Sequence, residues 1–191
     1  MGIHTNMTKT KVINIFGAPS TGKSTLASGL FYKMKMRGCT VELAYEYIKD
    51  KVYEGSPYPF QDQLYTFAKQ NKKIRQLVGK VDYVICDSPL LQGLVYQSDK
   101  EPKILTQTIL DYFNMYDNVN ILLHRSHKFQ EVGRVHSEEE SKRIGEQIEA
   151  TLQRYNIPHT VLPTNNALEN MVKIFEMLES EHEQYQEGEG R

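Results

Sequence analysis

The sequence contains no tryptophan, only two cysteines and no long apolar run. Cys39 and Cys86 match neither a metal-binding spacing nor a disulfide framework, so we expect two reduced thiols in or beside apolar strands. The apolar runs are short and strand-like, such as Val81–Cys86, whereas a membrane-spanning helix needs about 20 apolar residues. The N-terminus lacks the apolar core and small-residue cleavage site of a signal peptide. We therefore expect a cytoplasmic protein that does not bind membranes.

An excess of one charge is also missing, because the formal net charge is −1. This balance argues against a surface that binds polyanions over its whole area, although a local basic patch and a DNA substrate remain open. Apolar residues make up 39% of the chain and charged residues 25%, as in ordinary globular proteins. A length of 191 residues is enough for one buried core. We predict one domain over residues 1–180 and a disordered acidic tail over 181–191.

Strand-like and helix-like segments alternate along the chain. This alternation predicts an α/β fold with a parallel sheet and crossover helices on both faces. Apolar and β-branched runs predict five strands, at Lys11–Phe16, Thr40–Ala44, Val81–Cys86, Val119–Leu123 and His159–Leu162. Helical patterns fall near Thr25–Arg37, Phe60–Val78, Pro102–Tyr116, Ser137–Tyr155 and Asn166–Glu179.

Two details of these helices can be predicted. Ser137 and Glu140 have the spacing of a capping box at the start of the fourth helix. The inner face of the second helix is expected to carry its apolar residues, namely Leu64, Phe67, Ala68, Ile74 and Leu77.

The segment Gly17-Ala-Pro-Ser-Thr-Gly-Lys-Ser24 matches the phosphate-loop pattern G-x-x-x-x-G-K-[ST] in full. It follows a predicted strand and opens a predicted helix, so backbone N–H groups and the helix N-terminus would face phosphate oxygens. We expect Lys23 to reach the β- and γ-phosphates and Ser24 to bind Mg²⁺. The alternative is a chance match in a glycine-containing turn. The residues expected to contact the nucleotide are Gly17, Ala18, Pro19, Ser20, Thr21, Gly22, Lys23, Ser24 and, at the α-phosphate, Thr25.

The phosphate loop alone does not distinguish kinases, ATPases and GTPases. A GTPase would need the base-reading sequence N-K-x-D, which the chain lacks. ATP with Mg²⁺ is therefore the expected nucleotide.

Carboxylates follow two of the predicted strands. Asp87 ends the third strand and Glu46 lies just past the second, so both are expected at the edge of the sheet where ligands bind. Asp87 would bind Mg²⁺ or accept a proton, unless it only caps the strand. Glu46 would act as a base or orient the acceptor, unless it is a solvated helix-starting glutamate. Which carboxylate is the base is left open.

A basic segment follows the fourth strand. Arg125, Lys128 and Arg134 would close over the triphosphate and neutralise charge in the transition state. The alternative is an ordinary basic surface loop. The nearby histidines have no partners at metal-binding spacing.

Several amides are weaker candidates for binding a base. Asn165 follows the fifth strand and would either border the adenine or cap the next helix. Gln61, Gln63 and Gln70 lie in or near an aromatic-rich stretch. They would hold a nucleobase or nicotinamide, or belong to a packing helix.

Taken together, the phosphate loop, Tyr45-Glu-Tyr47, Asp87-Ser-Pro89 and Gly133-Arg-Val-His-Ser-Glu-Glu139 resemble small P-loop kinases of the ribosylnicotinamide-kinase-like group, many of them phage-encoded. The resemblance covers about Lys11–Leu178. It implies a three-layer fold with an adenylate-kinase-like sheet of order 2-3-1-4-5 and a lid at about 124–136. It also implies that Asp87 lies near Mg²⁺ and the acceptor, and that Arg125 and Arg134 lie on the lid. The Asp-Ser-Pro end of the third strand differs from the Asp-Thr-Asp type found in the nicotinamide enzymes.

These observations predict a Mg-ATP-dependent phosphotransferase. Its acceptor would be a hydroxyl of a nucleoside-, riboside- or nucleotide-like molecule, in the host cytoplasm if the protein is phage-encoded. One alternative is a kinase that phosphorylates 5-hydroxymethyluracil in phage DNA. Another is a P-loop ATPase or switch that acts through a protein partner. The identity of the acceptor and the oligomeric state are left open.

Overall fold

Five short strands form a single parallel sheet in the computed structural model, which describes residues 10–47, 54, 62–98, 101–126, 137–166 and 169–178. The order across the sheet is β2-β3-β1-β4-β5, and every neighbouring pair is parallel, so the predicted 2-3-1-4-5 order is confirmed. The strands are β1 (Lys11–Phe16), β2 (Val41–Ala44), β3 (Tyr83–Cys86), β4 (Asp117–His124) and β5 (Thr160–Pro163).

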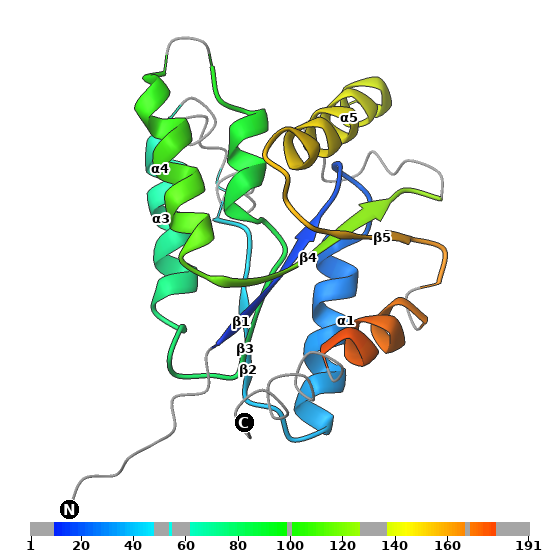
Figure 1. Ribbon diagram of the computed structural model, residues 1–191. Helices are drawn as coiled ribbons and strands as arrows, with labels where there is room; N and C mark the ends of the chain where they lie inside the picture. The colour runs from blue at the N-terminus through cyan, green and yellow to red at the C-terminus, as the bar shows by residue number, and fades with distance from the viewer. Residues whose placement is uncertain are drawn as a thin grey trace, which may run out of the picture.

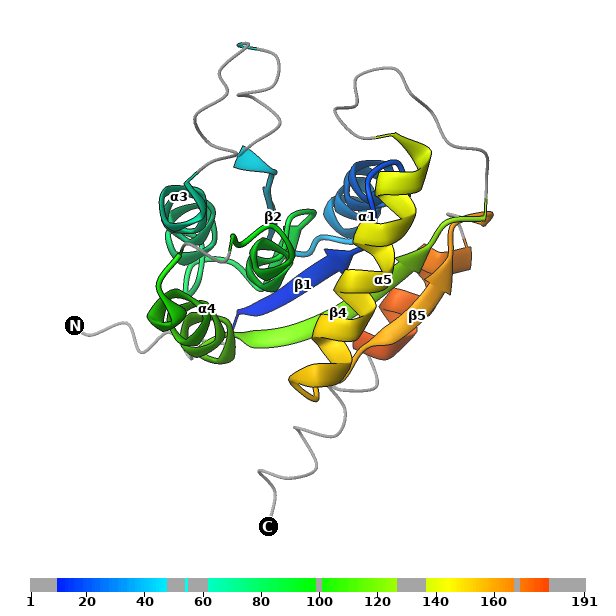
Figure 2. The same ribbon diagram turned by 90° about the horizontal axis from the view of Figure 1, so that it is seen from above.

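Helices cover both faces of this sheet (Figures 1 and 2). One face packs against α1 (Lys23–Met36) and the helix at 169–178, and the other against α3 (Gln63–Arg75), α4 (Lys103–Asn114) and α5 (Glu138–Arg154). Alternation along β1 produces the two cores, because Ile13 and Ile15 join one apolar cluster while Val12 and Phe16 join the other. Among the described residues, no helix combines the length and the apolar character that a membrane span requires.

The sequence did not predict the short 3-10 helix η2 (Leu90–Val95), which follows β3 almost directly. It packs against α3, α4 and α5, and Leu90 and Leu91 are buried there. η2 therefore lies between the end of the central strands and the helices of that face.

The predicted inner face of α3 is partly wrong. Leu64 is 60% exposed and Ala68 is exposed as well, whereas the buried residues are Gln63, Phe67, Gln70, Asn71 and Ile74. The buried stripe keeps a helical spacing but begins one residue earlier. Polar side chains can lie inside because they find partners: the Gln70 amide donates to Ala44 O (3.3 Å), and Asn71 Oδ1 accepts from the Tyr116 hydroxyl (2.6 Å).

Three asparagines form a polar cluster inside the sheet. Asn14 lies in the middle of β1 with 1% of its surface exposed, and it is in register with Asn120 of β4. Its side-chain nitrogen donates to the Oδ1 atoms of Asn118 (2.8 Å) and Asn120 (3.0 Å). A slip of β4 by one residue would turn these side chains to the other face. The cluster therefore specifies the register of β1 against β4.

We predict that Asn14→Val lowers the free energy of unfolding by about 1–3 kcal/mol, because it leaves the amide oxygens of the buried Asn120 and the partly buried Asn118 without their donor. Denaturant titration followed by circular dichroism measures this. Val161→Ala, at a half-exposed position of the edge strand β5, is the control and should change stability by less than about 0.5 kcal/mol. An unfolding midpoint of Asn14→Val equal to that of the wild type would contradict the assigned role of the cluster.

Candidate nucleotide-binding site

The loop between β1 and α1 adopts conformations that require glycine. Gly17 and Gly22 have positive φ angles of 152° and 83°. A Cβ atom on Gly17 would lie 2.7 Å from the Thr21 hydroxyl and 3.1 Å from Leu123 O, so any side chain there would displace the loop from β4. Gly22 is the N-cap residue of α1, and its left-handed conformation leads the chain into the helix. These two positions let the backbone wrap around the helix N-terminus, as anion-binding loops do.

The Lys23 side chain folds back over this loop. Its ammonium group donates to the carbonyl oxygens of Gly17 (2.8 Å) and Ala18 (3.0 Å). The Thr21 hydroxyl also donates to Ala18 O, at 2.9 Å. The positive charge of Lys23 is thus held over the loop that would surround the phosphates.

Ser24 and Asp87, the pair predicted as metal ligands, lie in direct contact. The Ser24 hydroxyl donates to Asp87 Oδ2 at 2.8 Å, and Asp87 is only 3% exposed. Within the described ranges, no group of three or more His, Cys, Asp and Glu side chains could hold a metal ion. A pair of oxygen ligands nevertheless fits Mg²⁺, which is commonly bound by one or two protein groups together with phosphate oxygens and water.

The second oxygen of Asp87 holds the segment that carries Glu46. Asp87 Oδ1 accepts a hydrogen bond from the Glu46 backbone N–H at 2.9 Å. Gln70 supports the same segment, because its Oε1 accepts from Tyr47 N (3.1 Å) while its amide reaches Ala44 O. Sequence reasoning considered Gln70 as a base-binding amide, but in the structure it holds the backbone after β2.

The Glu46 side chain is half-buried, and its negative charge acts on Tyr96 and Cys86. Burial raises the pKa of Tyr96 to about 12, and the negative charge of Glu46 adds to this increase. Burial also raises the pKa of the Cys86 thiol to about 12, and the charges of Asp87 and Glu46 raise it further. Glu46, Asp87 and Tyr96 therefore lie close together at the carboxyl end of β2 and β3.

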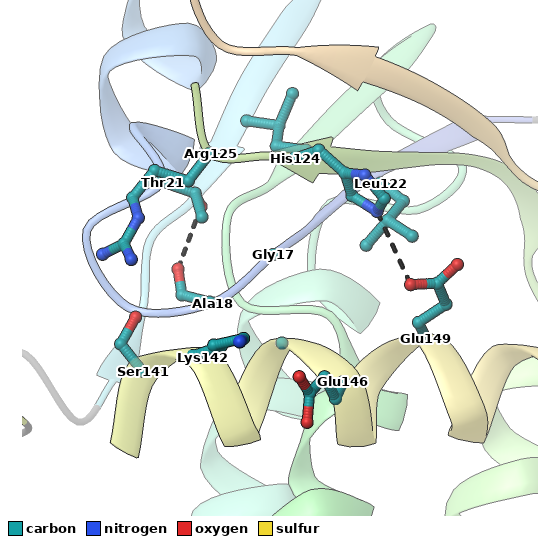
Figure 3. Close-up of a pocket in the computed structure, with 12 residues that line it drawn as sticks. Gly17, Ala18, Thr21, Leu122, His124, Arg125, Ser141, Lys142, Glu146 and Glu149 are labelled. Atoms are coloured by element: carbon teal, nitrogen blue, oxygen red, sulfur yellow. Dashed lines mark hydrogen bonds and ion pairs between the residues drawn. The ribbon is translucent and has the colours of Figure 1, made fainter. Parts of the chain in front are cut away.

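Arg125 is the part of the predicted lid that the structure describes. Its guanidinium group forms an ion pair with Glu138 (3.1 Å), and the side chain is 18% exposed. It lines a cavity of about 370 Å³ between the phosphate loop, the end of β4 and α5 (Figure 3). Residues from all three elements line this cavity, including Gly17, Ala18, Thr21, His124, Ser141 and Glu149.

Other predicted residues do not join this arrangement. Arg134 and Lys128 lie outside the described residues, as do positions 127–136 of the predicted lid and Gln61. Asn165 is exposed after β5 and does not line the cavity. Its neighbour Asn166 accepts a hydrogen bond from Glu169 N at 3.2 Å, as a helix cap does.

Sequence reasoning missed the contact between α5 and the back of the phosphate loop. The predicted capping box is present, with Ser137 Oγ accepting from Glu140 N and Glu140 Oε2 accepting from Ser137 N. One residue on, the Ser141 hydroxyl donates to Pro19 O at 2.8 Å. A Cβ atom on Gly145 would lie 3.4 Å from that of Ala18, so α5 approaches the loop closely there.

A family model described as an AAA domain matches residues 12–169. No curated protein matches the sequence. Among solved structures, a thymidylate kinase from Ehrlichia chaffeensis aligns with a TM-score of 0.66 and 13% identity, over 89% of this chain and 99% of that one.

Two further structures share the fold. The NadR protein in complex with NAD and AMP-PNP aligns with a TM-score of 0.66 and 15% identity over 87% of this chain, which spans only 49% of that protein. A deoxyadenosine kinase from M. mycoides, solved with products dCMP and dCDP, aligns with a TM-score of 0.54 and 19% identity, over 88% and 99% of the two chains. At such identities these likenesses show a P-loop fold.

We predict that the two cysteines differ sharply in reactivity. Cys86 has a pKa raised to about 12, so at pH 8 its buried thiol carries almost no thiolate, the nucleophilic form. Cys39 is partly exposed and should react with Ellman's reagent in the folded protein. We expect one thiol to react rapidly with the reagent in buffer, and both thiols to react rapidly in guanidinium chloride. Equal rates for both thiols in the folded protein would contradict the buried environment next to Asp87.

Proposed function

The chain belongs to the AAA domain family, and from that premise we propose that it transfers the γ-phosphate of Mg-ATP to a hydroxyl of a nucleoside-, riboside- or nucleotide-like acceptor. The observation that carries this proposal is the position of Asp87, which contacts Ser24 at the phosphate loop and the backbone of Glu46 on the other side. One carboxylate thus joins the expected donor side of the site to its expected acceptor side.

On the donor side, the loop N–H groups and the N-terminus of α1 would bind the phosphates. The Lys23 ammonium would leave the carbonyl oxygens of Gly17 and Ala18 for the more strongly negative β- and γ-phosphate oxygens. Ser24 and Asp87 would hold Mg²⁺, which supplies charge neutralisation at the phosphates. Their contact supports this assignment, because both oxygens already point to one place.

On the acceptor side, we assign the role of base to Glu46. Both oxygens of Asp87 are engaged, by Ser24 and by the Glu46 backbone, whereas the Glu46 carboxylate lies near the partly buried Tyr96. Glu46 would take the proton of the acceptor hydroxyl as that oxygen bonds to the γ-phosphorus. The bond between this phosphorus and the β–γ bridging oxygen breaks, and its electron pair leaves with ADP.

The segment after β4 would complete the site as a lid. Arg125 lies at the beginning of that segment and lines the cavity beside the phosphate loop, which supports a role in closure (Figure 3). The lid over 124–136, the role of Arg134, the contact of Asn165 with adenine and the single kinase domain of residues 1–180 remain predictions. The structural neighbours named thymidylate kinase and deoxyadenosine kinase support an acceptor of the nucleoside or nucleotide class.

One surface observation favours a second candidate, a kinase that acts on a base in DNA. Tyr45 and Tyr65, 51% and 43% exposed, lie on the segment that carries Glu46 and on α3. Lys69 lies over the Tyr65 ring (5.1 Å) and Lys73 over the Tyr47 ring (5.9 Å). Exposed aromatic rings combined with cations are what proteins use to bind single-stranded nucleic acid. The acceptor of this candidate would be 5-hydroxymethyluracil.

The function is tested by a screen of nucleosides, ribosides, nucleotides and 5-hydroxymethyluracil-containing DNA with γ-labelled ATP. We expect label in one class of acceptor, and a loss of at least about 100-fold in Lys23→Ala because that substitution removes the cation at the transferred phosphate. Lys35→Ala is the matched control, since Lys35 lies at the far end of α1 in an exposed ion pair with Glu42. Retention of label in DNA alone would select the second candidate. Phosphate release without any labelled acceptor would reject both in favour of an ATPase or switch.

We also predict that substitutions of the two carboxylates change different kinetic parameters. Asp87→Asn should raise the Mg²⁺ concentration for half-maximal rate at least about 10-fold, because a metal ligand loses its charge. Glu46→Gln should lower kcat about 100-fold or more at unchanged ATP affinity, because it removes the base. The control is Asp117→Asn, which breaks an ion pair with Lys11 (3.5 Å) at the opposite end of the sheet and should leave both parameters unchanged. Identical Mg²⁺ dependence in Asp87→Asn and the wild type would contradict the assigned roles.

A further inference from the structure

Gln92 is a buried polar residue without a role in the proposed phosphate transfer. It lies on η2, five positions after Asp87, between the buried Leu91 and the glycine at position 93. Only 6% of its surface is exposed. Glutamine is seldom buried to this extent unless its amide is fully hydrogen-bonded.

The orientation of the Gln92 amide follows from its contact with Tyr96. Their hydrogen bond lowers the pKa of the Tyr96 phenol, acting against burial and the charge of Glu46. Gln92 Oε1 has no hydrogen-bond partner among the described residues, so the amide N–H is the group that pairs with the phenol oxygen. Among these residues, the carbonyl oxygen of the amide is thus left as an unpaired, buried acceptor.

A second buried acceptor lies in the same region. The Gln63 backbone N–H donates to Glu101 Oε1 at 3.0 Å, while Glu101 Oε2 is buried without a hydrogen-bond partner in the described part of the chain. Gln63 also lies next to η2, because its side-chain Oε1 would be 3.9 Å from a Cβ atom added to Gly93. Glu101 and Gln92 are therefore near the same residue. The region therefore offers oxygen acceptors and negative charge, and its natural complement is an N–H donor.

The position of Gln92 assigns it to the acceptor side of the site. Tyr96 is hydrogen-bonded to Gln92, and it also lies near the negative charge of Glu46, the base proposed above. A molecule whose hydroxyl reaches Glu46 would thus bring its other end towards η2.

We propose that Gln92 Oε1 accepts a hydrogen bond from an N–H group on the planar head of the acceptor. The site then selects acceptors that carry a lactam, amine or carboxamide N–H on this planar group. It rejects analogues whose nitrogen is fully alkylated, and analogues in which a carboxylate replaces the carboxamide. A carboxylate head would in addition face the charges of Glu46 and Glu101. This inference rests on the proposed phosphotransferase function and names the determinant of its acceptor specificity.

Matched pairs of acceptors test the proposal. The pairs are thymidine with 3-N-methylthymidine, adenosine with N6,N6-dimethyladenosine, and nicotinamide riboside with nicotinic acid riboside. For the pair that the enzyme phosphorylates, we expect the wild type to prefer the N–H member by at least about 10-fold in kcat/KM, since a buried acceptor is left unpaired by the other member. Gln92→Met should bring this ratio close to one, mainly through a higher KM for the N–H member.

Two further variants separate recognition from folding. Gln97→Met is the matched control, because Gln97 Oε1 already accepts from the Thr106 hydroxyl at 2.8 Å, and this variant should keep the wild-type ratio. Gln92→Glu retains an acceptor oxygen at the same place and should keep a preference for the N–H member even if Gln92→Met does not fold. Thermal unfolding and ATP binding of each variant report whether the fold is intact.

The failures of the two proposals are distinguishable. If the wild type binds ATP but phosphorylates neither member of any pair nor any other acceptor, the proposed function is rejected and this inference with it. If it phosphorylates both members of a pair equally, or if the preference persists in a folded Gln92→Met, the role of Gln92 is overturned while the phosphotransferase function stands.

Discussion

The Asp87 carboxylate holds together three segments on which the candidate site depends. It is buried at the end of β3, and its two oxygens accept hydrogen bonds from the Ser24 hydroxyl and from the Glu46 backbone. A buried charge needs such partners, because water is not available to solvate it. The start of α1 and the segment after β2 are thereby fixed against the central strands. This arrangement also defines two sides of the site, with phosphates expected at Ser24 and the acceptor at Glu46.

The surrounding helices support this arrangement from opposite directions. Gln70 of α3 holds the backbone on both sides of Glu46, through Ala44 O and Tyr47 N. Ser141 of α5 holds the phosphate loop from behind through Pro19 O. Amide and hydroxyl side chains make these contacts because they can satisfy backbone groups that no strand or helix satisfies. The buried polar side chains of these helices thus position loops, and their buried apolar side chains pack against the sheet.

Sequence reasoning succeeded where the pattern is local. The strands were found from short β-branched and apolar runs, although β4 is longer than expected because its first two residues are polar. Ser24 and Asp87 were paired in advance, since a phosphate loop and the end of a neighbouring parallel strand meet at one edge of the sheet. It failed on α3, where the apolar Leu64 is exposed and three amide residues are buried. η2 was missed because its buried residues belong to no recognisable helical or strand repeat.

By itself, the sequence determined the phosphate loop, the alternation of strands and helices and, through a family resemblance, the order of the sheet. All of these follow from residues close together in the chain or from a motif whose spacing has a physical cause. The tertiary structure decided which polar groups face one another. Ser24 and Asp87 are 63 residues apart, and Ser141 and Pro19 are 122 apart. A glutamine has the same local signature whether it holds a backbone, as Gln70 does, or leaves an acceptor oxygen unused, as Gln92 does. Only the packing of the helices on the sheet distinguishes these cases, because it determines whether a hydrogen-bonding group from a distant part of the chain lies within reach.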